Sequence, residues 1–125
     1  MEKFFKIAIV VIGVLMAIIW LRMMIAPMGI AERMAMNPEV PLGLNNIRAF
    51  FGLYIGSLAV FLFLTLKKGD KQWLLVPICL EVFSVIGRTG GLIMDGFHEK
   101  IVLYIFIEIV LAIFLFAAYR KLPSK

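Results

Sequence analysis

Long apolar stretches separated by short polar segments make up most of this chain. Four of them are long enough to cross a bilayer, because a hydrocarbon core about 30 Å thick needs about 20 helical residues. They cover residues 4–26, 46–66, 73–93 and 101–119. The pattern therefore predicts an all-α integral membrane protein, a four-helix bundle formed by a single domain over residues 1–125.

The composition indicates the same class of protein. Hydrophobic residues make up 63% of the 125 residues, charged residues only 17%, and the mean hydropathy is +1.03. A soluble domain is about half apolar and about one quarter charged, so this composition excludes a soluble enzyme. The single cysteine, Cys79, excludes a disulfide scaffold, and the scarcity of polar sequence excludes a disordered chain.

Basic residues are distributed unevenly between the two sides of the predicted bundle. Eight lie on the side shared by the N-terminus, the second connection and the C-terminus, and only Arg33 and Lys100 lie in the opposite loops. The eight are Lys3, Lys6, Lys67, Lys68, Lys71, Arg120, Lys121 and Lys125. Because cytoplasmic segments carry the excess of Lys and Arg, we expect both termini in the cytoplasm. This belt also explains most of the net charge of +5 without a nucleic-acid partner, since its cations meet the headgroups of the lipid bilayer.

The first connection, residues 27–45, contains three prolines and two glycines, which interrupt regular structure. A short amphipathic helix is nevertheless expected there. Its apolar positions are Met28, Ala31, Met34 and Ala35, and its charged positions are Glu32 and Arg33. We expect this interfacial helix on the outer surface, either as a lid over the bundle or as a segment at the level of the headgroups.

Five ionisable side chains fall inside the predicted spans, where an unpaired charge costs several kcal/mol. They are Arg22, Arg48, Glu81, Arg88 and Glu108. Arg88 and Glu108 lie at nearly the same depth in two spans that a short loop joins. Such spans pack antiparallel, so we expect these two residues to form a buried salt bridge.

Glu81, Ser84 and Arg88 recur at helical spacing and so lie along one stripe of the third span, which must face the bundle interior. Glu81 lies deepest and has no cation at its own depth. On the outer side, polar residues at the helix ends would form a mouth to the bundle. They are Arg22, Arg48, Asn45, Asn46, Asp95 and His98.

The intraspan groups comprise three arginines and two glutamates, so their sum is positive even when both acids are ionised. Because a guanidinium holds carboxylate or phosphate through two parallel hydrogen bonds, this excess favours an anionic guest. Tyr54 and Tyr104, with Phe50, Phe51 and Phe83, would line the apolar part of such a pocket, or else pack in the core. The alternative for the arginines is structural, as staples between helices and as side chains that extend to the headgroups.

Small residues predict two places of close approach. Gly52 and Gly56 lie four residues apart on one face of the second span, which predicts a packing seam with another span or with a second protein. Gly87, Gly90 and Gly91 would loosen the end of the third span, so that backbone or ligand can approach it.

Most metal and cofactor chemistries lack the residues that they need. Haem held by two histidines is excluded because the chain has only His98, and one cysteine cannot form a dithiol centre or a thiolate zinc site. The methionines are better explained as adaptable packing residues than as copper ligands. We expect no metal and no cofactor, and we assign no catalytic residue.

Two local strings resemble a known group of proteins. The first is Asn45-Asn46-Ile47-Arg48-Ala49-Phe50-Phe51-Gly52, and the second is Gly87-Arg88-Thr89-Gly90-Gly91, followed by Asp95-Gly96. Over most of its length the chain resembles small bacterial four-span proteins with a domain of unknown function, akin to the DoxX-like families. The resemblance implies a left-handed four-helix bundle in the bacterial inner membrane. It supplies no catalytic residues and no activity that transfers residue by residue.

Three functions fit this pattern. In the first, which we prefer, the bundle binds or moves an anionic lipid-like or amphipathic small molecule in an outward-facing pocket, where the arginines hold it. Glu81 and Glu108 would then orient the arginines or relay a proton. In the second, the chain is an accessory or assembly subunit, or a homo-oligomer, that docks through Gly52 and Gly56. In the third, it is an enzyme acting on a lipid or quinone, with Glu81 or Glu108 as acid or base.

The charge distribution predicts the topology of the chain. A C-terminal fusion of green fluorescent protein should fluoresce, and a C-terminal fusion of alkaline phosphatase should be inactive, because each reports a cytoplasmic C-terminus. Phosphatase inserted after Met36, in the first outer loop, should be active. An active phosphatase at the C-terminus would reverse the orientation.

Overall fold

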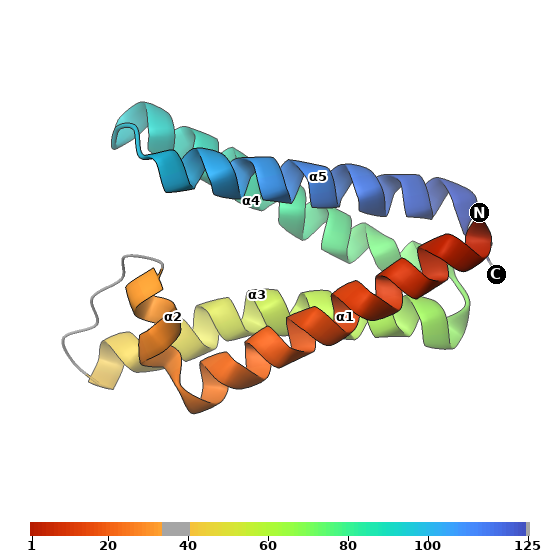
Figure 1. Cartoon of the computed structure of the whole chain (residues 1–125), viewed down its shortest axis with the longest axis horizontal. Helices are drawn as coiled ribbons and strands as arrows, with labels where there is room; N and C mark the ends of the chain where they lie inside the picture. Colours follow the sequence, from red (N-terminus) through yellow and green to blue (C-terminus); the bar gives the residue numbers. More distant parts are fainter. Residues whose placement is uncertain (34–40, 125) are drawn as a thin grey trace.

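The computed structural model describes residues 1–33 and 41–124 of the chain. Within these ranges the chain forms α-helices and one short 3₁₀ helix, without a strand (Figure 1). The elements are α1 (Glu2–Ile25), α2 (Pro27–Arg33), α3 (Pro41–Lys68), η1 (Lys71–Leu74), α4 (Leu75–Met94) and α5 (Glu99–Lys121). The prediction of an all-α fold is confirmed.

The described residues contain four segments that are long and apolar enough to cross a membrane. They are Glu2–Ile25, Ile47–Lys68, Lys71–Met94 and Glu99–Lys121, each within two residues of a predicted span at either end. Large apolar side chains remain exposed along all four, and Phe83, for example, is 70% exposed. Lipid tails solvate such a surface and water does not, so this is the structure of a multi-pass membrane protein.

Local residues explain the ends of the first helices. Pro27 begins α2 directly after α1, because proline suits a first helical position and cannot continue the hydrogen bonding of a helix. After α3, Gly69 has a φ of 62°, a left-handed conformation that glycine adopts without strain. Asp70 then caps η1, since its Oδ1 accepts a hydrogen bond from the Gln72 N–H at 3.0 Å.

The connection between α4 and α5 is also short and capped. Gly96 has a φ of 105°, which again requires glycine. Nδ1 of His98 accepts a hydrogen bond from the Lys100 N–H at 3.1 Å. The only histidine of the chain is therefore the N-cap of α5, in the loop where the pattern places it.

The helices form two antiparallel hairpins, one of α1 and α3 and the other of α4 and α5 (Figure 1). The hairpins meet at the end that holds both termini and diverge toward the other end (Figure 1). Between them, α3 packs on α4 and α1 approaches α5, whereas α1 and α4 do not approach each other within the described residues. The expected bundle is therefore closed at one end only.

The closed end has an apolar core to which both hairpins contribute. Its buried residues are Ile9, Leu62, Leu74, Leu115, Ala118 and Leu122. In addition, the Lys71 N–H donates to the Pro123 carbonyl at 3.1 Å, which ties η1 to the segment after α5. These contacts hold the two hairpins together at this end.

The diverging end has a smaller core of its own. Met23, Ala31 and Ile47 form it, from α1, α2 and α3, and no residue of α4 or α5 belongs to it. In Figure 1, α2 lies on the side of the α1–α3 hairpin that faces α4 and α5. Within the described residues, the two hairpins therefore share no buried core at this end.

The short helix predicted in the first connection exists as α2. Ala31 is buried, and the charged pair Glu32–Arg33 is exposed, as the amphipathic pattern requires. Met28 is 43% exposed, so only part of the predicted apolar face is covered. Met34 and Ala35 lie outside the described residues. The location of α2 at a membrane surface stays a prediction.

The glycine seam predicted on the second span packs against α1. A methyl group added to Gly56 would lie 3.0 Å from the Trp20 ring, and one added to Gly52 would lie 2.6 Å from Cε of Met24. The two glycines therefore let α1 side chains approach the backbone of α3. Of the two alternatives, the structure shows packing within the chain.

The glycines at the end of the third span lie inside the regular helix α4. A methyl group added to Gly87 or Gly90 would meet nothing within 4 Å, and one added to Gly91 would meet only Oδ2 of Asp95, at 3.7 Å. No other part of the described chain packs closely on Gly87 or Gly90. Their use in the approach of a ligand stays a prediction.

Gly56→Ala should destabilise the α1–α3 hairpin, because the added methyl group would press on the Trp20 ring. We expect the free energy of unfolding to fall by about 1–3 kcal/mol, measured by denaturant unfolding in one detergent. Gly87→Ala is the matched control: it makes the same change within a helix, where the methyl group meets nothing within 4 Å, so stability should not fall. Equal losses in the two variants would contradict the seam.

Candidate functional site

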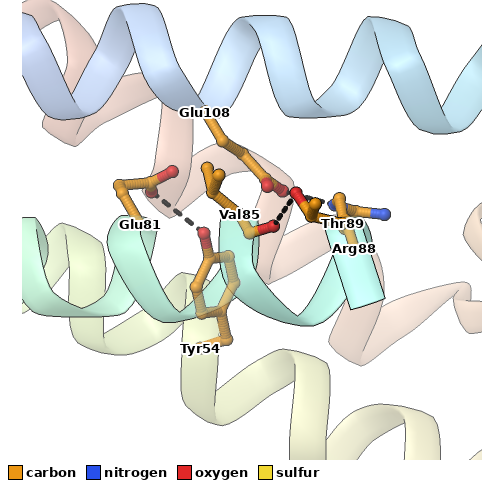
Figure 2. Close-up of polar contacts among 6 residues, drawn as sticks. All are labelled: Tyr54, Glu81, Val85, Arg88, Thr89 and Glu108. Atoms are coloured by element: carbon orange, nitrogen blue, oxygen red, sulfur yellow. Dashed lines mark hydrogen bonds and ion pairs between the residues drawn. The ribbon is translucent and has the colours of Figure 1, made fainter. Parts of the chain in front are cut away.

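Arg88 and Glu108 form an ion pair between α4 and α5 (Figure 2). Nε of Arg88 donates to Oε1 of Glu108 at 2.7 Å. Glu108 is only 8% exposed. The salt bridge predicted from the depths of the two residues is therefore confirmed. It forms because the short connection between α4 and α5 brings equal depths of the two helices side by side.

The guanidinium of Arg88 also lies against an aromatic ring. Its Cζ is 4.9 Å from the centre of the Tyr104 ring, one turn before Glu108 on α5. Ring and carboxylate thus hold the guanidinium on one face of α5. Within the described residues, Nε is the only nitrogen of this guanidinium with a protein acceptor, so the other N–H groups remain available to another molecule.

Glu81 accepts a hydrogen bond that crosses from one hairpin to the other. The hydroxyl of Tyr54 on α3 donates to Oε1 of Glu81 on α4 at 3.0 Å (Figure 2). Glu81 is 1% exposed. This hydrogen bond joins α3 of one hairpin to α4 of the other. Along α3, Tyr54 lies between Leu62 of the shared core and Ile47 of the separate core.

Sequence reasoning missed this hydrogen bond. The pattern predicts Tyr54 as a residue that lines the apolar part of a pocket or packs in the core, and it predicts no cation at the depth of Glu81. The signal was available, because the predicted spans place residues 54 and 81 at depths that differ by only about 6 Å. A search for cations overlooks a phenol, which also satisfies a buried carboxylate by donating a hydrogen bond.

Each of the two buried carboxylates keeps one oxygen without a hydrogen bond. Oε2 of Glu81 and Oε2 of Glu108 are covered by protein, and neither has a partner among the described residues. Leaving such a group unpaired costs about 1–3 kcal/mol, and more when it is charged. Native structures contain few such atoms, so these two require an explanation, and a bound hydrogen-bond donor would supply one.

Two residues of α4 that carry hydroxyl groups, Ser84 and Thr89, follow Glu81 along the helix. Ser84 is half-buried, one turn after Glu81. Thr89 is occupied by its own helix, since its hydroxyl donates to the Val85 carbonyl at 2.8 Å (Figure 2). We call six of the side chains from α3, α4 and α5 the polar cluster: Tyr54, Glu81, Ser84, Arg88, Tyr104 and Glu108.

Arg22 and Arg48 lie at the diverging end of the other hairpin. Nε of Arg48 donates to the Met24 carbonyl at 3.1 Å, which ties α3 to the end of α1. Arg22 is exposed in the last turn of α1. The α4–α5 hairpin diverges from this end (Figure 1), and within the described residues no hydrogen bond or ion pair joins either arginine to the polar cluster.

The predicted outer mouth is divided in the same way. Asn45 lies on α3, whereas Asp95 and His98 lie in the connection of the other hairpin, and all three are exposed. The side chain of Asn46 lies outside the described part. The structure therefore does not assemble one polar mouth from these residues.

The charge of the polar cluster differs from the charge counted along the sequence. Only one arginine, Arg88, joins the two glutamates, so the cluster has a formal charge of −1 when both acids are ionised. The positive excess of the five intraspan groups depends on Arg22 and Arg48, which lie elsewhere. It therefore does not describe this cluster.

An open groove of about 260 Å³ lies on α3. Its lining consists of Gly52, Leu53, Gly56, Ser57, Val60 and Phe61. None of these residues belongs to the cluster, so the groove is not the Arg/Glu-lined pocket expected from the sequence. Across residues 1–33 and 41–124, no group of three or more His, Cys, Asp or Glu side chains is placed to hold a metal ion.

These features define a class of protein: a small multi-pass membrane protein whose four long apolar helices form two hairpins around buried charges. The chain belongs to the family described as "Domain of unknown function (DUF4345)", whose model matches residues 4–119. No curated protein and no solved structure matches the chain.

Arg88→Met should destabilise the protein strongly, because it would leave Glu108 buried without its cation. We expect a loss of about 3–5 kcal/mol in the free energy of unfolding in detergent, most of which the double variant Arg88→Met/Glu108→Leu should recover. Lys6→Met is the matched control, because Lys6 pairs with Glu2 at 2.6 Å while their side chains are 49% and 50% exposed.

The control variant should lose less than about 1 kcal/mol, as exposed ion pairs do. A double variant no more stable than Arg88→Met would show that packing, and not an unpaired charge, causes the loss.

Proposed function

We propose that this protein binds an amphipathic, lipid-like small molecule within the membrane, with the polar end of that molecule at the polar cluster. The observation that supports this function is the pair of buried carboxylate oxygens without hydrogen bonds, on Glu81 and Glu108. A binding partner that supplies donors there would remove a cost that the protein alone does not remove.

A purely structural role explains only part of the cluster. One arginine and one glutamate suffice to staple α4 to α5, and Arg88 and Glu108 do so at 2.7 Å. Glu81 adds a second carboxylate at 1% exposure, with Tyr54 as its only hydrogen-bond partner in the described chain. An ionisable side chain inside a membrane span is costly, which makes a functional role the first explanation for Glu81.

The apolar part of the guest has a place beside the cluster. The two hairpins diverge toward the end away from the termini (Figure 1), where the buried core of Met23, Ala31 and Ile47 includes no residue of α4 or α5. A molecule with an apolar tail can therefore lie along the diverging helices while its polar end reaches the cluster.

Further parts of the proposal come from the sequence. Both termini lie in the cytoplasm of a bacterial cell and the protein lies in the inner membrane, as the basic belt and the resemblance to DoxX-like proteins suggest. Arg22 and Arg48 would then meet the guest or the headgroups at the outer surface. These residues are exposed at one end of the α1–α3 hairpin, which agrees with either role.

Native mass spectrometry of the gently solubilised protein tests the function. After prolonged delipidation, wild type should keep a discrete added mass, and Arg88→Met/Glu108→Leu should lose it, because that variant removes the ion pair without leaving an unpaired charge. The control is Lys6→Met/Glu2→Leu, which removes the exposed ion pair of α1 and should keep the added mass.

Two results would reject the proposal. One is wild type that carries no added mass. The other is an added mass that both double variants keep equally, which would mark it as lipid adhering anywhere on the apolar surface.

A further inference from the structure

We infer that the guest of the polar cluster carries a primary ammonium group as its polar end. This inference rests on the proposed function and names the chemical class of the ligand. It starts from two observations: the formal charge of the cluster, and the kind of hydrogen-bonding atom that is left unpaired in it.

The charge of the cluster calls for a cation. Glu108 pairs with the single guanidinium of the cluster, that of Arg88, and Glu81 accepts a hydrogen bond from the neutral hydroxyl of Tyr54 on α3. Arg22 and Arg48, the other intraspan cations, make no hydrogen bond or ion pair with the cluster in the described structure. One unit of negative charge is therefore uncompensated when both acids are ionised, and hydrocarbon does not solvate it.

The unpaired atoms call for a donor. Oε2 of Glu81 and Oε2 of Glu108 are buried, and an ionised carboxylate oxygen only accepts hydrogen bonds. A phosphate or carboxylate on the guest could bind the free N–H groups of Arg88. As the only polar group of the guest, it would nevertheless add acceptors and negative charge to a place that already has an excess of both.

A primary ammonium meets both requirements, because it has one positive charge, three N–H donors and no acceptor. A quaternary ammonium has the charge but no N–H, and it relies on free aromatic faces. Here the Tyr104 ring already lies 4.9 Å from the Arg88 guanidinium. A hydroxyl donates one hydrogen bond but leaves the charge uncompensated. The guest is therefore an amphiphile with a primary ammonium head and a lipid-like tail.

The arrangement of the hairpins gives this head a route. Oε2 of Glu81 and Oε2 of Glu108 are both covered by protein. Tyr54, which belongs to the α1–α3 hairpin, is hydrogen-bonded to Glu81 (Figure 2). The hairpins separate toward the end away from the termini (Figure 1). The ammonium would approach Glu81 from that side, beside the hydrogen bond that Tyr54 donates to it.

Lipid competition tests the inference. The delipidated full-length protein is incubated with vesicles of equimolar phosphatidylethanolamine, phosphatidylcholine and phosphatidylglycerol with identical acyl chains, and retained lipid is identified by native mass spectrometry. Phosphatidylethanolamine and phosphatidylcholine share a phosphate and a cationic nitrogen, but only the first has N–H donors. We expect wild type to retain phosphatidylethanolamine about tenfold over each of the other two lipids, as charged hydrogen bonds provide.

Single substitutions test whether Glu81 and Glu108 cause the preference for phosphatidylethanolamine. Glu81→Gln and Glu108→Gln should each reduce it to less than about threefold, because each removes a charge while keeping the shape of the side chain. Glu99→Gln makes the same change at an exposed position in the first turn of α5 and should leave the preference unchanged. The comparison of lipids on wild type does not depend on the folding of any variant.

The outcomes separate the inference from the proposed function. Equal retention of phosphatidylethanolamine and phosphatidylcholine, or a preference for phosphatidylglycerol, overturns the ammonium head. If that retention still requires Arg88 and Glu108, the proposed function stands. Wild type that retains none of the lipids and no other added mass overturns both.

Discussion

A charge buried among apolar helices has no solvent, and the Arg88–Glu108 ion pair is the contact that meets this constraint in the α4–α5 hairpin. Apolar side chains give helices little reason to associate in lipid, since lipid tails solvate them equally well. The charged hydrogen bond of 2.7 Å between Arg88 and Glu108 gives α4 and α5 a reason to associate, because either residue alone would be a buried charge without a partner. The pair therefore stabilises the register that the short connection gives to α4 and α5, and the Tyr104 ring lies against the same guanidinium.

The second constraint is the unequal packing of the two ends. A core shared by both hairpins closes the end near the termini, whereas Met23, Ala31 and Ile47 form a core of the α1–α2–α3 part alone. Between these cores the hydrogen bond from Tyr54 to Glu81 is what joins the hairpins through side chains in the described structure. Along α3, Tyr54 of the polar cluster thus lies between the buried residues of the shared core and those of the separate core.

The proposed chemistry of the ligand follows from the carboxylate charge and the carboxylate oxygens that have no partner in the polar cluster. An ion pair that only joins two helices contains one cation for each anion. This cluster instead has one carboxylate more than it has guanidinium groups. The excess group, Glu81, is also the one that contacts the other hairpin. The carboxylate in excess is therefore the one that a hydrogen bond joins to the other hairpin.

The sequence by itself determined the membrane class, the four spans to within two residues, the short helix after Pro27 and the Arg88–Glu108 pair. These features depend on residue type and on distance along one helix or one tight hairpin, which periodicity and rise per residue supply. Only the tertiary structure decided that Tyr54 is the partner of Glu81, that Gly52 and Gly56 pack on α1, and that Arg22 and Arg48 lie apart from Arg88. Such contacts depend on which helices become neighbours. The spacing of Gly52 and Gly56 predicts a packing seam but not its partner, and apolar helices in lipid carry no pattern along the sequence that specifies how one hairpin lies against the other.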